Sequence, residues 1–106
     1  MSRLTLGVGV LLALVGSAVA QERAGSAADG HRFVETYCSG CHPVELRVAR
    51  AGGIAPDFVT IASRPSTTRK SLTEFFQSSH ALMPNFRLTQ EEASDIIAYL
   101  LSLKQR

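Results

Sequence analysis

The stretch Cys38-Ser39-Gly40-Cys41-His42 decides how the rest of this 106-residue chain is interpreted. Its two thiols are separated by two residues and followed at once by an imidazole. Each cysteine sulfur can add across one vinyl group of a porphyrin, and the adjacent histidine then reaches one face of the iron as an axial ligand. The chain has only two cysteines and three histidines, so chance rarely produces this pattern. The motif predicts that one haem is attached covalently through Cys38 and Cys41 and bound by His42.

Three other kinds of site share parts of this motif. A thioredoxin-like redox pair follows a strand of a βαβ unit, and no alternating β-branched run precedes Cys38. A structural zinc site needs four Cys or His ligands, whereas this chain has one cluster plus the dispersed His31 and His80. A short-loop disulfide leaves His42 without a role. Haem attachment accounts for all three residues of the motif, so it is the preferred interpretation.

The first twenty residues have the pattern of an export signal. Arg3 supplies a short basic region, Leu4 to Val15 is mainly apolar, and Ala18-Val19-Ala20 offers small residues to a signal peptidase. We therefore expect a signal peptide over residues 1–20 and a periplasmic protein. The apolar stretch 4–20 is at the lower limit of length for crossing a bilayer, so an uncleaved membrane anchor stays open as the alternative.

Cleavage would leave a single small chain, residues 21–106. Its formal charge would fall from +2 to +1 because Arg3 is lost. A chain of this size has a marginal core, which a large apolar prosthetic group can complete. Lys70 and Lys104 are the only lysines, and the near-neutral charge argues against nucleic acid as a partner. We expect a monomer or a subunit of a redox complex, without a membrane span in the mature form.

Helical signals dominate the first half of the mature chain. After a flexible lead-in over 21–28, Asp29 is the expected N-cap of a helix that runs to Tyr37 and presents the haem motif. This helix opens the folded domain, expected over 29–106. The segment 44–50 has room for one turn, and a short helix is expected to begin within 54–58, with Pro56 at its first helical position. Ile54 and Phe58 would then be available to pack on the ring.

The second half predicts two more helices. Ser66 or Thr67 is the expected N-cap of a helix that stops by Ser79 and whose apolar face holds Leu72, Phe75 and Phe76. The run Thr89-Gln90-Glu91-Glu92 is a capping box, and apolar residues follow it at helical spacing: Ala93, Ile96, Ile97, Leu100 and Leu103. Lys104 is placed to complement the helix dipole. No alternating strand pattern appears, so the predicted fold class is all-α.

A second axial ligand is needed on the iron face opposite His42, and methionine sulfur or histidine nitrogen is the usual donor. Met83 is the only thioether that remains after the signal peptide is removed. It lies 41 residues after His42, beside Pro84 and between two predicted helices. His80 and His31 are the rival donors, for which an exposed position at the surface is the ordinary interpretation. We expect His42 and Met83 to be the metal ligands.

From Asp29 to Lys104 the chain resembles class I c-type cytochromes of the small bacterial monohaem kind. The resemblance rests on Gly30 and Phe33 before the motif, on Ala55-Pro56-Asp57-Phe58, on Met83-Pro84-Asn85-Phe86 and on Ile96-Ile97-Ala98-Tyr99-Leu100. It implies three main helices with loops wrapped around one covalently attached haem c. It also implies that the first and last helices cross where Gly30 and Phe33 meet Ile97, Tyr99 or Leu100. The carbonyl of Pro56 would accept a hydrogen bond from His42.

Two features depart from that family's pattern. Pro43-Val44 replaces a glycine-containing continuation after the motif, and the chain has no tryptophan to contact a haem propionate. The candidates for that contact are Arg47, Arg64, Arg69 and Tyr37.

With both axial positions filled by the protein, the iron is closed to substrate and one-electron exchange remains. The sequence thus predicts an electron-transfer protein rather than an enzyme, a periplasmic carrier that passes electrons between respiratory or dehydrogenase partners, one a donor and one an acceptor. Two alternatives remain. One is a haem peroxidase or gas-binding sensor with a labile distal ligand. The other is a dedicated cytochrome subunit of one oxidoreductase.

Overall fold

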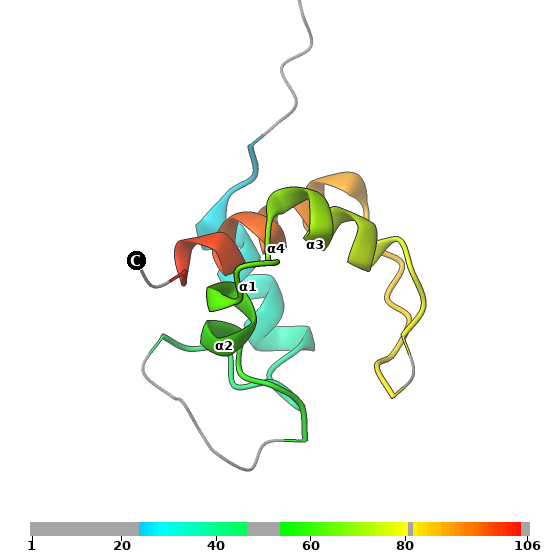
Figure 1. Cartoon of the computed structure of the whole chain (residues 1–106). Coiled ribbons are helices and arrows are strands. Elements are labelled where there is room, and N and C mark those ends of the chain that lie inside the picture. Colours follow the sequence, from blue (N-terminus) through cyan, green and yellow to red (C-terminus); the bar gives the residue numbers. More distant parts are fainter. Residues whose placement is uncertain (1–23, 47–53, 81, 105–106) are drawn as a thin grey trace, which may run out of the picture.

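The computed structural model describes residues 24–46, 54–80 and 82–104. These residues form four helices and no strand (Figure 1): α1 (Ala27–Tyr37), α2 (Phe58–Ser63), α3 (Arg69–Phe76) and α4 (Gln90–Ser102). The all-α prediction is confirmed, and α1, α3 and α4 are longer than the short α2. The apolar stretch 4–20 and most of the turn expected over 44–50 lie outside the described residues. Within the described part, no helix has the length and apolar character needed to cross a membrane.

Helices α1 and α4 cross at Gly30, which is buried. A Cβ atom at Gly30 would lie 2.0 Å from the carbonyl oxygen of Asp95 and 2.9 Å from the backbone nitrogen of Ile96. Only glycine lets two helix backbones approach this closely, because any side chain would drive them apart. The crossing was expected to involve Ile97, Tyr99 or Leu100. The atoms nearest to the glycine belong to the backbone of Asp95 and Ile96, directly before the first of these residues.

Helix α1 begins three residues before the expected position. Its N-cap is Ser26, whose side chain accepts a hydrogen bond from the backbone N–H of Asp29, so the prediction of Asp29 as N-cap was wrong. The backbone N–H of Ser26 also donates to Oδ1 of the buried Asp95 at 2.6 Å. This contact with α4 fixes the start of α1, and a contact 69 residues away in sequence is not visible to local pattern. Part of the lead-in expected over 21–28 therefore belongs to the helix and its cap.

Helix α2 is capped by Asp57, whose carboxylate accepts from the backbone N–H and the hydroxyl of Thr60 at 2.8 and 2.7 Å. Pro56 was expected at the first helical position, but it lies before the cap, in the chain that leads into the helix. The capping group at Asp57 moves the helix start two residues along the chain, to Phe58. The carbonyl of Pro56 is thereby left outside the helix.

Helix α3 is capped by Thr68, with a capping box between Thr68 and Ser71. Ser66 and Thr67 were the expected caps, and both were wrong. Thr67 is buried, and its hydroxyl donates to the carbonyl of Ile61 at 2.6 Å, so it is used to join α2 to the chain that enters α3. The helix ends at Phe76, before the limit expected at Ser79.

Helix α4 begins as expected. Thr89 and Glu92 exchange both hydrogen bonds of the capping box, at 3.1 and 2.8 Å. At its other end Leu103 is buried in the core. The ammonium of Lys104 donates to the carbonyl of Thr67 at 3.1 Å, so it ties α4 to the start of α3 in place of the dipole role expected for it.

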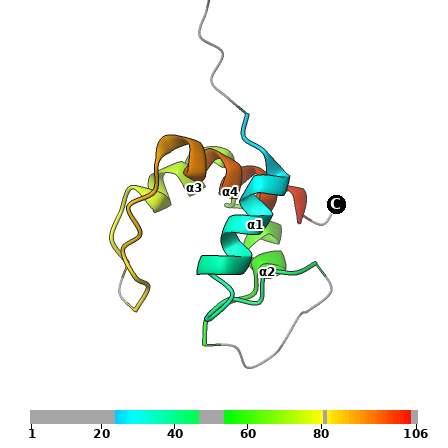
Figure 2. The same ribbon diagram turned by 180° about the vertical axis from the view of Figure 1, so that it is seen from behind.

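The core lies between α1 and α4 and is closed by α2 and α3. Its buried apolar side chains are Val34, Val44, Phe58, Ala62, Leu72, Ile96, Ile97, Tyr99, Leu100 and Leu103. Seen from both sides, the chain from 77 to 89 leaves the helices on one side of α1, and the chain after residue 37 turns beneath the end of α1 (Figure 2). The haem motif and Met83 thus lie on two separate loop segments that leave the same helical core, one after α1 and one between α3 and α4.

Candidate functional site

The haem motif is a tight turn that continues directly from α1. Cys38 is the C-cap of the helix, and its backbone N–H donates to the carbonyl of Val34 at 2.9 Å. The N–H groups of Cys41 and His42 then return to the carbonyl of Cys38 at 3.2 and 2.9 Å. The two thiols are not joined in a disulfide. Because α1 ends in this turn, the position of both thiols is set by a well-packed helix.

The two cysteines differ in environment. Cys38 is partly buried and faces a pocket, whereas Cys41 is exposed. Burial raises the pKa of the Cys38 thiol to about 11, so the thiol is neutral at ordinary pH. A thioredoxin-like redox site needs a thiol whose pKa is lowered. The direction of this shift therefore argues against that alternative.

His42 is held by the carbonyl of Pro56. Its ring Nδ1 lies 2.6 Å from that oxygen, and a carbonyl oxygen accepts but cannot donate, so Nδ1 carries the proton. In the neutral ring Nε2 then keeps its lone pair, the state in which imidazole binds a metal. The ring also packs at a tilt on Phe58, with 5.2 Å between centroids. The contact that the resemblance implied is present, and it leaves the lone pair of Nε2 available.

The chain that brings Pro56 to His42 is itself tied to the motif. The backbone N–H of Ala55 donates to the carbonyl of Cys41 at 3.2 Å, and that of Phe58 donates to the carbonyl of Pro43 at 2.9 Å. Phe58 is buried and anchors this loop in the core, whereas Ile54, expected to pack on the ring, is 89% exposed. Pro43, which departs from the family pattern, thus still holds the loop that carries Pro56, through its carbonyl.

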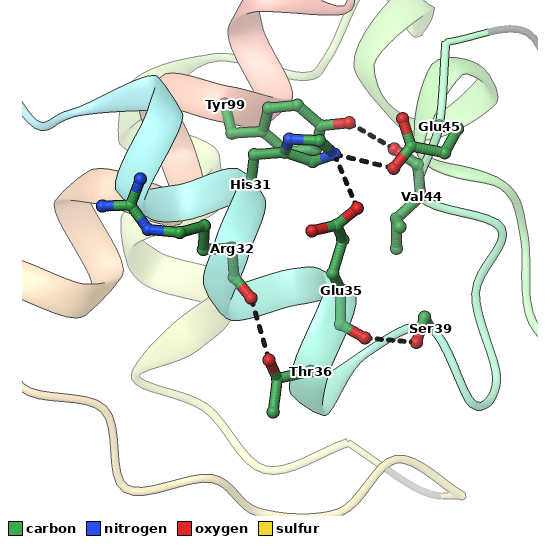
Figure 3. Close-up of polar contacts among 8 residues, drawn as sticks. All are labelled: His31, Arg32, Glu35, Thr36, Ser39, Val44, Glu45 and Tyr99. Atoms are coloured by element: carbon green, nitrogen blue, oxygen red, sulfur yellow. Dashed lines mark hydrogen bonds and ion pairs between the residues drawn. The ribbon is translucent and has the colours of Figure 1, made fainter.

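A polar network holds the segment that follows His42 (Figure 3). The buried hydroxyl of Tyr99 on α4 donates to the carbonyl of Val44 at 2.5 Å. His31 on α1 stacks on the Tyr99 ring, with 4.7 Å between centroids, and its Nε2 lies 2.7 Å from a carboxylate oxygen of Glu45. The bond from His31 lowers the pKa of Glu45, while burial and then the charge of Glu45 raise that of Tyr99 to about 12. His31 therefore contacts the segment that follows the motif. It is not among the residues that line the pocket.

A pocket of about 430 Å³, part of which is open to solvent, lies between the two loop segments. Most of its wall is apolar or aromatic. Contributions come from α1 and the motif (Phe33, Cys38), from α3 (Phe75, Phe76), from the chain between α3 and α4 (Ser78, His80, Met83, Pro84, Asn85, Phe86, Leu88) and from α4 (Ile96). Cys38 and Met83 thus line one pocket, although 45 residues separate them. A flat apolar group bound to Cys38 would contact this wall, whose lining residues do not include His42 or Cys41.

Met83 is half-buried in that wall, within a non-helical segment between α3 and α4. The residue before it, Leu82, has a positive φ of 69° and a fully exposed side chain. The residue after it is Pro84. A thioether is a soft donor that suits iron in a cytochrome, so the donor chemistry of the pocket fits haem.

His80 departs from the surface position expected for it. Its ring stacks face to face on Phe75 of α3, with 3.7 Å between centroids and 17° between planes. Its Nε2 is buried and has no hydrogen-bond partner in the described part of the chain. Sequence reasoning missed this ring contact. It placed Phe75 on the apolar face of a helix, and His80 lies five residues later, beyond the end of that helix.

The candidates for a propionate contact do not meet in the pocket wall. Arg69 donates to the carbonyl of Ala24 at 3.3 Å, and Arg64 is exposed. Tyr37 packs on Phe33 with 4.7 Å between centroids. Arg47 lies outside the described residues.

Comparison with known proteins agrees with this geometry. Residues 25–100 match the family model described as cytochrome C oxidase, cbb3-type, subunit III. The chain is also 35% identical over 98 residues to cytochrome c-552 of Bradyrhizobium diazoefficiens (strain USDA 110), which covers 92% of this chain and 93% of that protein. The chain belongs to the cytochrome c family. This cytochrome carries one covalently bound c-type haem, and it is an electron-transfer protein with redox partners rather than an enzyme.

Proposed function

We propose that this cytochrome is a periplasmic one-electron carrier with His42 and Met83 as axial ligands and with thioether bonds at Cys38 and Cys41. The observation that supports this most strongly is the hydrogen bond from Nδ1 of His42 to the carbonyl of Pro56, which leaves Nε2 as the ligand atom. Met83 is the thioether in the wall of the pocket that Cys38 also lines.

When bound, the haem supplies an iron centre that accepts and releases one electron. The residues of the chain set how readily it does so. The Pro56 carbonyl strengthens His42 as a donor by polarising its ring. The Met83 thioether favours the reduced iron and raises the reduction potential, and the aromatic wall adds to this by keeping water away. With a protein ligand on each face, substrate is denied access to the metal.

The ligand assignment is tested by replacing Met83 with Ala. The variant should lose the near-infrared sulfur-to-iron charge-transfer band, have a lower reduction potential and bind carbon monoxide in the ferrous state. Asn85→Ala, a change in the same pocket wall, is the matched control and should keep all three properties. A native spectrum in Met83→Ala, together with its loss in His80→Ala, would assign the distal position to histidine and remove the basis for a high potential.

The location is part of the same proposal. We place cleavage after Ala20, so that a chain beginning at Gln21 is released to meet a donor and an acceptor protein in the periplasm. Mass analysis of periplasmic and membrane fractions tests this. The expected mass is that of residues 21–106 plus one haem in the periplasmic fraction. A full-length chain in the membrane fraction would show that the apolar segment is an anchor.

A dedicated subunit is the second candidate, because the matching family model describes a subunit of an oxidase. The electron chemistry is the same in both cases. Gentle extraction separates them, since a free carrier elutes alone at the size of one chain and a subunit elutes with its oxidoreductase.

A further inference from the structure

We propose that His80 is a positioning residue for Met83, and that it acts through the face of its ring, stacked on Phe75, rather than through its buried Nε2. The inference rests on the proposed role of Met83 as distal ligand. It adds a residue, and a physical means, by which this chain keeps that ligand in place.

The segment that carries Met83 has little backbone support. After α3, the N–H of Ser78 donates to the carbonyl of Phe75 at 3.1 Å. Among described residues, the next backbone to backbone bond with a donor in this segment joins the N–H of Phe86 to the carbonyl of Pro84, also at 3.1 Å. Among the described residues of this segment, such backbone bonds therefore lie on either side of Met83 and not at it.

The backbone conformation of Leu82 is a second reason why this segment requires support from side-chain contacts. A leucine at a φ of 69° is in the left-handed region, which side chains with a Cβ adopt reluctantly. Such a conformation persists only where the surroundings impose it. The side chain of Leu82 is fully exposed and offers no packing that could compensate. Contacts on either side of Leu82 must hold the turn that places Met83 in the pocket wall.

Two aromatic contacts flank the turn. Upstream, the ring of His80 lies flat on Phe75 at 3.7 Å between centroids. Downstream, Phe86 meets Tyr37 edge to face at 6.4 Å. The upstream contact is the closer and lies three residues from Met83, and Phe75 is fixed in α3. The stack thus joins the ligand segment to a helix that packs on α4.

The ring face is what His80 supplies. Its buried Nε2 has no hydrogen-bond partner in the described structure, so a polar bond from that atom does not hold the segment. A phenylalanine would keep the flat stacking surface and remove a buried polar atom that lacks a partner, a change that is often neutral or stabilising.

The test compares His80→Phe with His80→Ala in the haem-loaded cytochrome. The readouts are the near-infrared charge-transfer band and the rate at which the ferrous protein binds carbon monoxide, which reports release of Met83. His80→Phe should match the unmodified protein. His80→Ala should keep the band but bind carbon monoxide about two to ten times faster, the range that one aromatic pair supplies. Ser79→Ala, an exposed change in the same segment, is the matched control and should have no effect.

Further variants keep the result interpretable. If His80→Ala folds poorly, His80→Gln takes its place, because glutamine fills part of the same space without a ring. His80→Gln should then bind carbon monoxide faster than the unmodified protein, as expected for His80→Ala. Phe75→Ala should raise the carbon monoxide rate as well, and combining it with His80→Ala should add little. The proposal is overturned if His80→Phe loses the band or binds carbon monoxide as fast as His80→Ala, or if His80→Ala equals the unmodified protein. Failure of the Met83 assignment is seen separately, as a native band in Met83→Ala.

Discussion

At the scale of single residues, His42, the proposed ligand, depends on how its neighbours present a hydrogen-bond acceptor. The Pro56 carbonyl fixes the tautomer of His42, and Asp57 fixes the Pro56 carbonyl because it caps α2 at the next position. The side chain of Thr60, and then its backbone N–H, donate to the Asp57 carboxylate and lower its pKa. The Asp57 carboxylate is thus linked through a single peptide to the group that holds His42, the proposed ligand.

A pH dependence follows from that carboxylate. A group whose pKa is lowered in the folded state adds stability above its unfolded pKa, about 4, and this stability is lost as the pH falls through the lowered, folded value. Asp57→Ala should lower the free energy of unfolding at neutral pH by about 0.5–2 kcal/mol, the usual value of an N-cap. Asp57→Asn keeps a capping oxygen but cannot titrate. Its free energy of unfolding should therefore fall less steeply as the pH is lowered through the acid range. Denaturant unfolding of both variants across the acid range measures this. An unchanged slope across the acid range in Asp57→Asn would show that other carboxylates dominate it.

At the scale of elements, the helices were predictable because their causes are local. The capping box at Thr89 and Glu92 and the apolar spacing behind it give α4 without any tertiary information. The starts of α1 and α3 were not predictable in the same way. Ser26 is chosen over Asp29 by a bond to Asp95 on another helix, and Thr67 is removed from capping by its burial against α2. Where several capping residues stand close together, contacts distant in sequence decide among them.

At the scale of the whole molecule, the pocket forms because two loop segments, one after α1 and one between α3 and α4, leave the same helical core. The motif itself makes Cys38, Cys41 and His42 the candidates for holding the haem, since its spacing is a local signature of haem attachment. The placement of Cys38 and Met83 in one pocket depends on the α1 and α4 crossing at Gly30, which brings together segments 45 residues apart. The stack of His80 on Phe75 has no sequence signature, because its rings meet across a helix end.

The central claim is that protein ligands close both faces of the iron. The most direct measurement is the optical spectrum of the purified, unmodified cytochrome, oxidised and reduced, before and after carbon monoxide is added. Ligation by His42 and Met83 predicts a near-infrared sulfur-to-iron charge-transfer band in the oxidised protein and a ferrous spectrum that carbon monoxide leaves unchanged over the time of the measurement. Absence of that band with rapid carbon monoxide binding would contradict the claim. It would show an open iron, as in a haem peroxidase or a gas sensor.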